Sequence, residues 1–161
     1  MDDSIIDFSL RTVEWKDNKV IMIDQTKLPN QLVFVTYDDY NQVADAIRNL
    51  VVRGAPAIGV SGAFGLALAS LQSKATTKDE LISDLEKARK ILYETRPTAV
   101  NLKWGLDKIM KVANSGNIVE QIRQSVINEA KKMAKIGMAN IQRCRTPKRM
   151  AKRIKSVLQK N

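Results

Sequence analysis

The segment Arg53-Gly54-Ala55-Pro56 begins a long apolar stretch and has the composition of an anion-binding site. Proline is favoured in the first turn of a helix, where its missing N–H costs nothing, so we expect a helix to begin here. Gly54 allows the backbone either to turn sharply or to lie close to another group. A helix N-terminus presents unpaired N–H groups and a partial positive charge, and the Arg53 guanidinium matches two phosphate oxygens. The alternative is a close-packed helix that needs no ligand at its start.

Arg96 is a second candidate, because it directly precedes Pro97. The residue before a proline disfavours the helical conformation, so a helix should end here and leave the side chain free to reach into a cleft. The alternative is a surface arginine near a helix C-terminus, where a cation is favourable in any case. Asn101 and Trp104 follow this break. We interpret both as structural, with Asn101 in the first turn of the next helix and Trp104 in the core.

The sequence contains no histidine and a single cysteine, Cys144. This composition excludes histidine-assisted nucleophiles, histidine metal sites and a disulfide within the chain. Basic residues around Cys144 would stabilise its thiolate, but no defined microenvironment is evident, so we interpret it as incidental. We therefore predict no catalytic residue, no metal site and no cofactor in this sequence.

The elements that must position these residues begin with β structure. Two runs of β-branched and apolar residues flank residues 16–19, where Asp17-Asn18 tolerates the positive φ of a tight hairpin turn. A third strand is expected over residues 31–37. Three short strands form a small antiparallel sheet with one face that must be covered.

From residue 38 onward, apolar residues recur with helical periodicity and predict five helices. The first follows an aspartate N-cap, the second begins after Gly54, and the third is announced by a capping box of Thr77 and Glu80. The fourth is expected over 98–114 and the fifth from about residue 117. The residues expected to face inward in the first and fifth helices are Val43, Ile47, Leu50, Val51, Ile118, Ile122, Val126 and Ala130.

The fold class predicted from these elements is α+β, with a small antiparallel sheet at the N-terminus followed by a helical bundle. Gly, Ala and Ser recur over residues 57–65 of the second helix. Each Gly costs a helix about 1 kcal/mol, so this composition is explained if other helices pass very close. We expect Gly59, Gly62 and Ala63 to lie at such a contact.

The net charge of +10 belongs to the C-terminal segment. Residues 131–161 contain 11 Lys and Arg and no acidic residue, whereas residues 1–130 contain 16 basic and 17 acidic residues. We therefore predict a domain over 1–130 and a basic tail over 131–161, which either binds RNA or an acidic surface without sequence preference or is simply solvated. The N-terminus lacks a signal-peptide pattern and the apolar run 56–71 is too short to span a bilayer, so a cytoplasmic protein with no membrane partner is expected.

Three segments resemble one known family: "EWKDNKVIMIDQTKLP", "VVRGAPAIGVSGAFGLALA" and "TRPTAVNLKWGLDKI". They are similar to the N-terminal part of methylthioribose-1-phosphate isomerases, which are related to the α, β and δ subunits of translation initiation factor 2B. The resemblance covers about residues 9–130. It implies that Arg53, Gly54 and Ala55 contact a sugar phosphate and that Arg96 is a second substrate-contacting arginine. The activity it implies is aldose–ketose isomerisation in methionine salvage.

The sequence departs from this family after residue 130. By the resemblance, the catalytic cysteine and aspartate belong to a C-terminal Rossmann-like domain, and neither segment is found here. The basic tail is expected to be the frame-shifted end of a disrupted gene, the stub of a split protein or a segment with its own role. The resulting hypothesis is an N-terminal domain, inactive alone, whose partner is a second copy or a complementary polypeptide. The alternative is a regulatory module related to initiation factor 2B subunits, with the tail contacting RNA.

Overall fold

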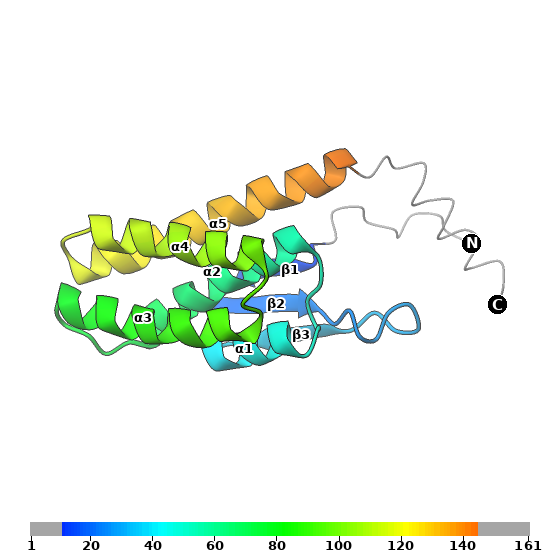
Figure 1. Ribbon diagram of the computed structural model, residues 1–161, viewed down its shortest axis with the longest axis horizontal. Coiled ribbons are helices and arrows are strands. Elements are labelled where there is room, and N and C mark those ends of the chain that lie inside the picture. Colours follow the sequence, from blue (N-terminus) through cyan, green and yellow to red (C-terminus); the bar gives the residue numbers. More distant parts are fainter. Residues whose placement is uncertain (1–10, 145–161) are drawn as a thin grey trace.

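A computed structural model of the chain describes residues 11–144. Within these residues, three strands are followed by five helices (Figure 1), which confirms the α+β class with a small N-terminal sheet and a helical bundle. The elements are β1 (Val13–Lys16), β2 (Lys19–Ile23), β3 (Phe34–Tyr37), α1 (Tyr40–Arg48), α2 (Ala55–Gln72), α3 (Lys78–Thr95), α4 (Val100–Ser115) and α5 (Val119–Cys144). The side chain of Cys144 and residues 145–161 lie outside the described part.

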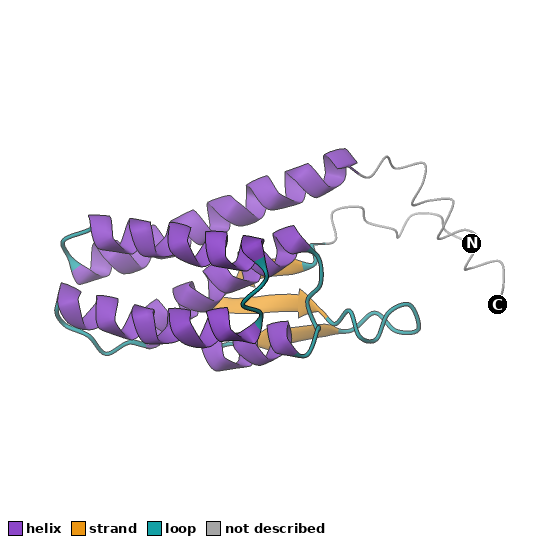
Figure 2. Ribbon diagram, in the orientation of Figure 1, coloured by secondary structure: helices purple, strands orange, loops and turns teal. Residues whose placement is uncertain are grey.

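The sheet is antiparallel in the order β1-β2-β3, and helices cover one of its faces (Figure 2). The β1–β2 turn has positive φ at both central residues, 51° at Asp17 and 57° at Asn18, as the hairpin prediction requires. Val20 and Met22 are buried beneath the helices, and the Trp15 ring lies 5.5 Å from that of Phe64 in α2. The sheet therefore packs on α2, the helix that begins at the candidate anion site.

Helix α2 is the centre of the fold and is buried on all sides from Ala57 to Ser70. It is long and apolar enough to cross a membrane by length and composition alone, but 78% of it is buried inside the fold, as in the core helix of a globular domain. Its small residues let α4 approach closely. A Cβ at Gly59 would lie 2.8 Å from the carbonyl oxygen of Asn101, and one at Gly105 would lie 2.5 Å from the carbonyl oxygen of Gly59. The expected close helix contact is therefore present, and α4 makes it.

Helices α1 and α3 begin with side-chain caps, as predicted. The Asp39 carboxylate accepts a hydrogen bond from the Asn41 N–H, and Thr77 and Glu80 form a complete capping box. Helix α3 ends two residues before Pro97. These ends were predictable because each depends on contacts within four residues along the chain.

Three of the inward-facing predictions were wrong. Trp104 is 56% exposed, because α4 turns the opposite face, with Leu102, Leu106 and Ile109, toward the core. Ile118 is also 56% exposed, because it precedes the start of α5. Leu50 lies beyond the end of α1, exposed, with a φ of 61°, and the hydrogen bond from the Val51 N–H to the Ala46 carbonyl closes that helix end around it.

Helix α5 is continuous from Val119 to Cys144, so the predicted domain boundary at residue 130 falls inside one helix. Ile122, Val126 and Ala130 are buried as expected. Further along, a Cβ at Gly137 would lie 3.5 Å from the Val60 side chain. The helix thus packs on the N-terminal half of α2 beyond residue 130. The division into domain and tail remains a prediction.

Candidate anion-binding site

A pocket of about 330 Å³ lies where the N-termini of α2 and α4 meet. It brings together three of the four predicted site residues. Gly54 and Ala55 are at the start of α2, and Arg96 lies some forty positions later in the chain. The fourth, Arg53, precedes the pocket, is exposed and does not line it. The complete lining is Gly54, Ala55, Ile58, Arg96, Ala99, Val100 and Asn101.

The start of α2 is shaped by the backbone of Gly54. Its φ is 93°, a conformation that side-chain-bearing residues rarely adopt, and a Cβ there would meet nothing within 4 Å. Of the two alternatives for this glycine, the structure therefore shows the sharp turn. Pro56 lies in the first helical turn, and the Ile58 N–H donates to the Gly54 carbonyl at 2.9 Å.

Arg96 reaches the pocket through the tight turn between α3 and α4. Its N–H donates to the Tyr93 carbonyl at 3.2 Å, and its carbonyl accepts from the Ala99 N–H at 3.0 Å. Pro97 sits between these two bonds and favours the extended backbone of Arg96, whose φ is −152°. The turn thus carries the chain out of α3, past the pocket and directly into the first turn of α4.

The two helix N-termini at the pocket differ in their capping from those of α1 and α3. The N-cap residues of α2 and α4 are Gly54 and Ala99, and within the described part of the chain neither helix has a side-chain cap or an acidic residue in its first turn. Helices α1 and α3 have side-chain caps, from Asp39 and Thr77. Unpaired N–H groups and the positive ends of two helix dipoles therefore meet at one place, which favours an anion there.

The two arginines near the pocket, Arg53 and Arg96, have no ion pair or side-chain hydrogen bond among residues 11–137. By contrast, Arg48 pairs with Asp45, Arg89 pairs with Asp107, and Arg123 donates to backbone carbonyls. Arg96 therefore presents a free guanidinium to the pocket, and its planar donors can bind two oxygens of one anion.

The lining residues contain no carboxylate, cysteine, lysine or tyrosine, the side chains that most often transfer protons in catalysis besides histidine. General acid–base catalysis needs a group that can gain and lose a proton near the operating pH. What the lining does offer is hydrogen-bond donors for an anion, from Arg96 and from the two helix N-termini.

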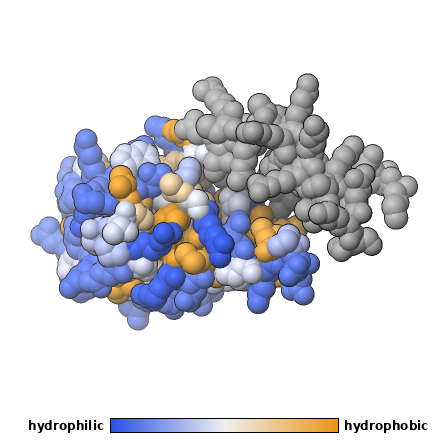
Figure 3. Space-filling model, turned by 45° about the vertical axis from the view of Figure 1, so that its right-hand side comes forward, coloured by the Kyte–Doolittle hydropathy of each residue, from blue (hydrophilic) through white to orange (hydrophobic). Residues whose placement is uncertain are grey.

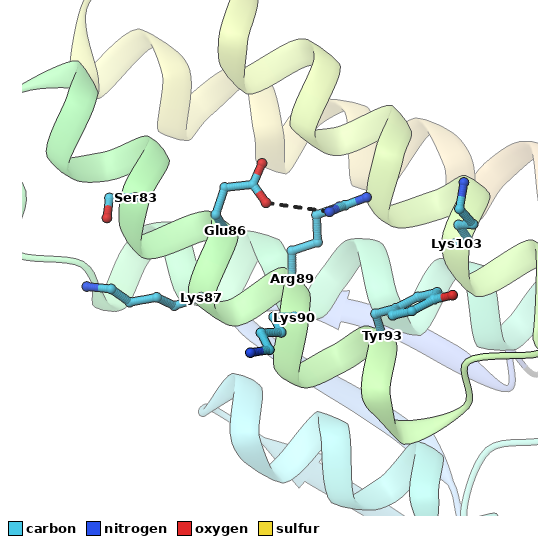
Figure 4. A pocket seen from close by; sticks show the side chains of 7 residues that line it. All are labelled: Ser83, Glu86, Lys87, Arg89, Lys90, Tyr93 and Lys103. Atoms are coloured by element: carbon cyan, nitrogen blue, oxygen red, sulfur yellow. Dashed lines mark ion pairs between the residues drawn. The ribbon is translucent and has the colours of Figure 1, made fainter.

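A larger surface depression, of about 640 Å³, lies over α3 and is a weaker candidate. Figure 4 shows that its lysines, Lys87 and Lys90 among them, point in different directions instead of converging. Arg89 is held by Asp107 and Glu86, and the hydrogen bond from Arg89 is the largest cause of the lowered pKa of the Asp107 carboxyl. These charges mainly satisfy one another across α3 and α4.

Comparison with known proteins establishes the family. The sequence profile of the initiation factor 2 subunit family matches residues 51–153, and the chain belongs to that family. The profile includes both segments that line the pocket, around Gly54 and around Arg96. It also extends well past residue 130, into the segment that the sequence predicts to be a divergent tail.

Within the family, the relatives found include isomerases and an initiation factor subunit. Methylthioribose-1-phosphate isomerase of Geobacter metallireducens is 46% identical over 124 residues, which are 76% of this chain and 36% of that protein. The crystal structure of 5-methylthioribose 1-phosphate isomerase from Pyrococcus horikoshii is 46% identical, with a TM-score of 0.74 over 78% of this chain and 36% of that one. Subunit delta of translation initiation factor eIF-2B from A. fulgidus is 42% identical, with a TM-score of 0.75 over 79% and 37%.

These comparisons confirm the resemblance to an N-terminal part of the isomerase and initiation factor 2B family. The chain spans little more than a third of the length of the relatives it matches. Sequence reasoning missed one polar lining residue, Asn101, which it interpreted as structural. It is in the first turn of α4, as expected, but it also lines the pocket. Its position five residues after Arg96, across the same helix break, was the available signal.

Proposed function

We propose that this domain holds the phosphate of a sugar phosphate at the pocket between α2 and α4. The main supporting observation is that two helix N-termini without side-chain caps converge there with Arg96, whose guanidinium has no partner within the described residues. Gly54 and Ala55 contribute backbone N–H groups, and Arg53 adds long-range positive charge from the adjacent position. The ligand class follows from the names of the relatives, which are isomerases of methylthioribose-1-phosphate.

The domain alone binds this ligand without isomerising it. Conversion of an aldose phosphate into a ketose phosphate moves a proton between C1 and C2, and the lining residues offer no acid or base for that step. Catalysis therefore requires groups from outside this lining, and a partner polypeptide, either a complementary chain or a second copy of this one, is a candidate to supply them. The Rossmann-like part that relatives are expected to contain would be one source of such groups.

Exposed apolar side chains at the pocket end support such a partner. Val100 is 78% exposed and lines the pocket, Trp104 follows one turn later, and Ile136 is half exposed next to the contact of α5 with Pro56. Figure 3 shows apolar patches among hydrophilic side chains on the face turned toward this end. Large exposed apolar groups around a polar pocket are typical of surfaces that another protein covers.

Titration with methylthioribose-1-phosphate, followed by amide chemical shifts, tests this proposal. We expect shifts at Gly54, Ala55 and Asn101, and a 10- to 100-fold loss of affinity in Arg96→Gln, since a charge-assisted hydrogen bond contributes about 1.5–3 kcal/mol. Arg48→Gln is the matched control, because Arg48 pairs with Asp45 on α1 and does not line the pocket. Equal effects of the two substitutions, or turnover of the ligand by the domain alone, would contradict the proposal.

A second candidate function is regulatory, and the similarity to the eIF-2B subunit delta structure favours it. In that case the basic segment contacts RNA, with an affinity that falls steeply as salt rises. Removal of residues 145–161 should then abolish RNA binding in a filter or fluorescence assay while sugar-phosphate binding stays intact. This cut spares α5, which packs on α2 as far as Gly137. RNA binding that survives the deletion would place the contact outside residues 145–161.

A further inference from the structure

The side-chain amide of Asn101 is the one feature of the pocket that phosphate binding leaves unexplained. Asn101 is the second residue of α4, half-buried, and lines the pocket together with Gly54 and Arg96. Within the described residues, its amide has no hydrogen-bond partner. Asparagine is also a weaker helix former than alanine, so helix stability does not account for it.

Capping does not explain Asn101 either. Asparagine stabilises a helix from the N-cap position, where its side-chain oxygen accepts a backbone N–H. In α4 the N-cap position is occupied by Ala99, whose side chain cannot cap a helix. Asn101 lies two positions after the N-cap. Capping of the helix therefore does not account for this amide.

The position of Asn101 is determined by the contact between α4 and α2. A Cβ at Gly59 would lie only 2.8 Å from the Asn101 carbonyl oxygen and 3.6 Å from its Cβ. The first turn of α4 is therefore pressed against the backbone of α2 one turn beyond Ala55. This contact fixes the backbone and Cβ of Asn101 relative to the start of α2, so the amide reaches the pocket from a firmly held base.

The chemistry of an amide suits a hydroxyl better than a phosphate. Phosphate oxygens accept hydrogen bonds, and the backbone N–H groups and Arg96 already supply donors. The asparagine side chain carries both a donor NH₂ and an acceptor oxygen, and the acceptor would be left unpaired against a phosphate. A hydroxyl group donates and accepts at once, so it can pair with both atoms.

We propose that Asn101 binds a hydroxyl group of the sugar and makes the pocket prefer a phosphorylated sugar over phosphate alone. This inference rests on the proposed function, because it assigns the sugar side of the same pocket. Arg96 and the helix N-termini bind the phosphate, and Asn101 recognises the sugar to which the phosphate is attached.

The test compares two probes, ribose 1-phosphate and inorganic phosphate, by NMR titration of the same variants. Asn101→Ala should weaken ribose 1-phosphate binding about five- to tenfold, the size of one hydrogen bond, and leave phosphate binding unchanged. Asn128→Ala is the matched control, since Asn128 is exposed on α5 and pairs with Gln124. Arg96→Gln should weaken the binding of both probes.

A second variant separates binding from folding. Asn101→Asp places a negative charge in the first turn of α4, which favours the helix but repels anions from the pocket. We expect an unchanged or higher melting midpoint together with loss of binding of both probes. If Asn101→Ala loses affinity equally for both probes, or for neither, the role of Asn101 is overturned while the proposed function still stands. If Arg96→Gln keeps its affinity for both probes, or if the unaltered chain binds neither, the proposed function is overturned and this inference with it.

Discussion

Gly105→Ala is expected to destabilise the domain by about 3 kcal/mol, because it forces apart the two helices that carry the pocket. The new Cβ would lie 2.5 Å from the Gly59 carbonyl oxygen and 3.3 Å from the Gly59 Cα. Both are backbone atoms of the buried core helix, so neither can move aside without shifting α2. The gain of about 1 kcal/mol in helix propensity from Gly to Ala offsets only part of this cost. Chemical denaturation of the two proteins measures the difference.

The matched control for this experiment is Gly62→Ala, on the face of α2 that contacts α4. There the nearest atom to the new Cβ is the Leu102 Cδ1, at 2.6 Å, which is the end of a flexible side chain. A change of the Leu102 rotamer can relieve most of the overlap, and the propensity gain then leaves a net cost of about 1 kcal/mol or less. Equal unfolding midpoints for the two variants would mean that α4 moves freely over α2.

Arg123→Ala should destabilise the domain by about 2–3 kcal/mol, because Arg123 caps the C-terminal end of α2 from α5. Its Nε–H donates to the Ser70 carbonyl at 2.9 Å, and its Nη2 donates to the carbonyls of Ser73 at 2.8 Å and Ala75 at 3.2 Å. These carbonyls lie at or just beyond the helix end, where a cation is favoured. The substitution leaves them unpaired in a partly buried place, which costs more than the bonds themselves contribute.

Two further variants separate the causes of this effect. Arg123→Lys keeps the charge but loses the planar set of donors, so we expect about half the destabilisation of Arg123→Ala. Glu120→Gln removes the ion pair with Arg123, and since Glu120 is 81% exposed it should change the stability by less than about 0.5 kcal/mol. Thermal unfolding of all three variants tests this order. A larger effect of Glu120→Gln than of Arg123→Ala would show that the ion pair, and not the cap, holds α5 to α2.

Local contacts determined what could be predicted about the fold from the sequence. The hairpin turn at Asp17-Asn18, the capping box at Thr77 and the first-turn proline at Pro56 all occur where expected. Each depends on the preferences of a few adjacent residues, which are present in the sequence itself. The predictions for Trp104 and Ile118 were wrong because burial depends on where a helix starts and which face meets the core.

The close packing of α2 was predictable, but its partner was not. The recurrence of Gly and Ala indicates that something approaches this helix, because small residues cost helix stability and need a reason. Only the tertiary structure shows that the approach is made by α4, backbone to backbone at Gly59 and Gly105. That pairing joins positions more than forty residues apart, and no local preference encodes it.

The candidate site likewise combines features that the sequence predicts with features that only the tertiary structure reveals. The sequence by itself determined the residue types suited to an anion: a glycine and a proline at a helix start, and an arginine before a proline. The tertiary structure decided that Gly54 and Arg96 meet at one pocket, that Arg53 stays outside its lining, and that Asn101 joins it. The physical reason is that helix ends and turns follow from neighbouring residues, whereas a pocket forms where packing brings distant helix ends together.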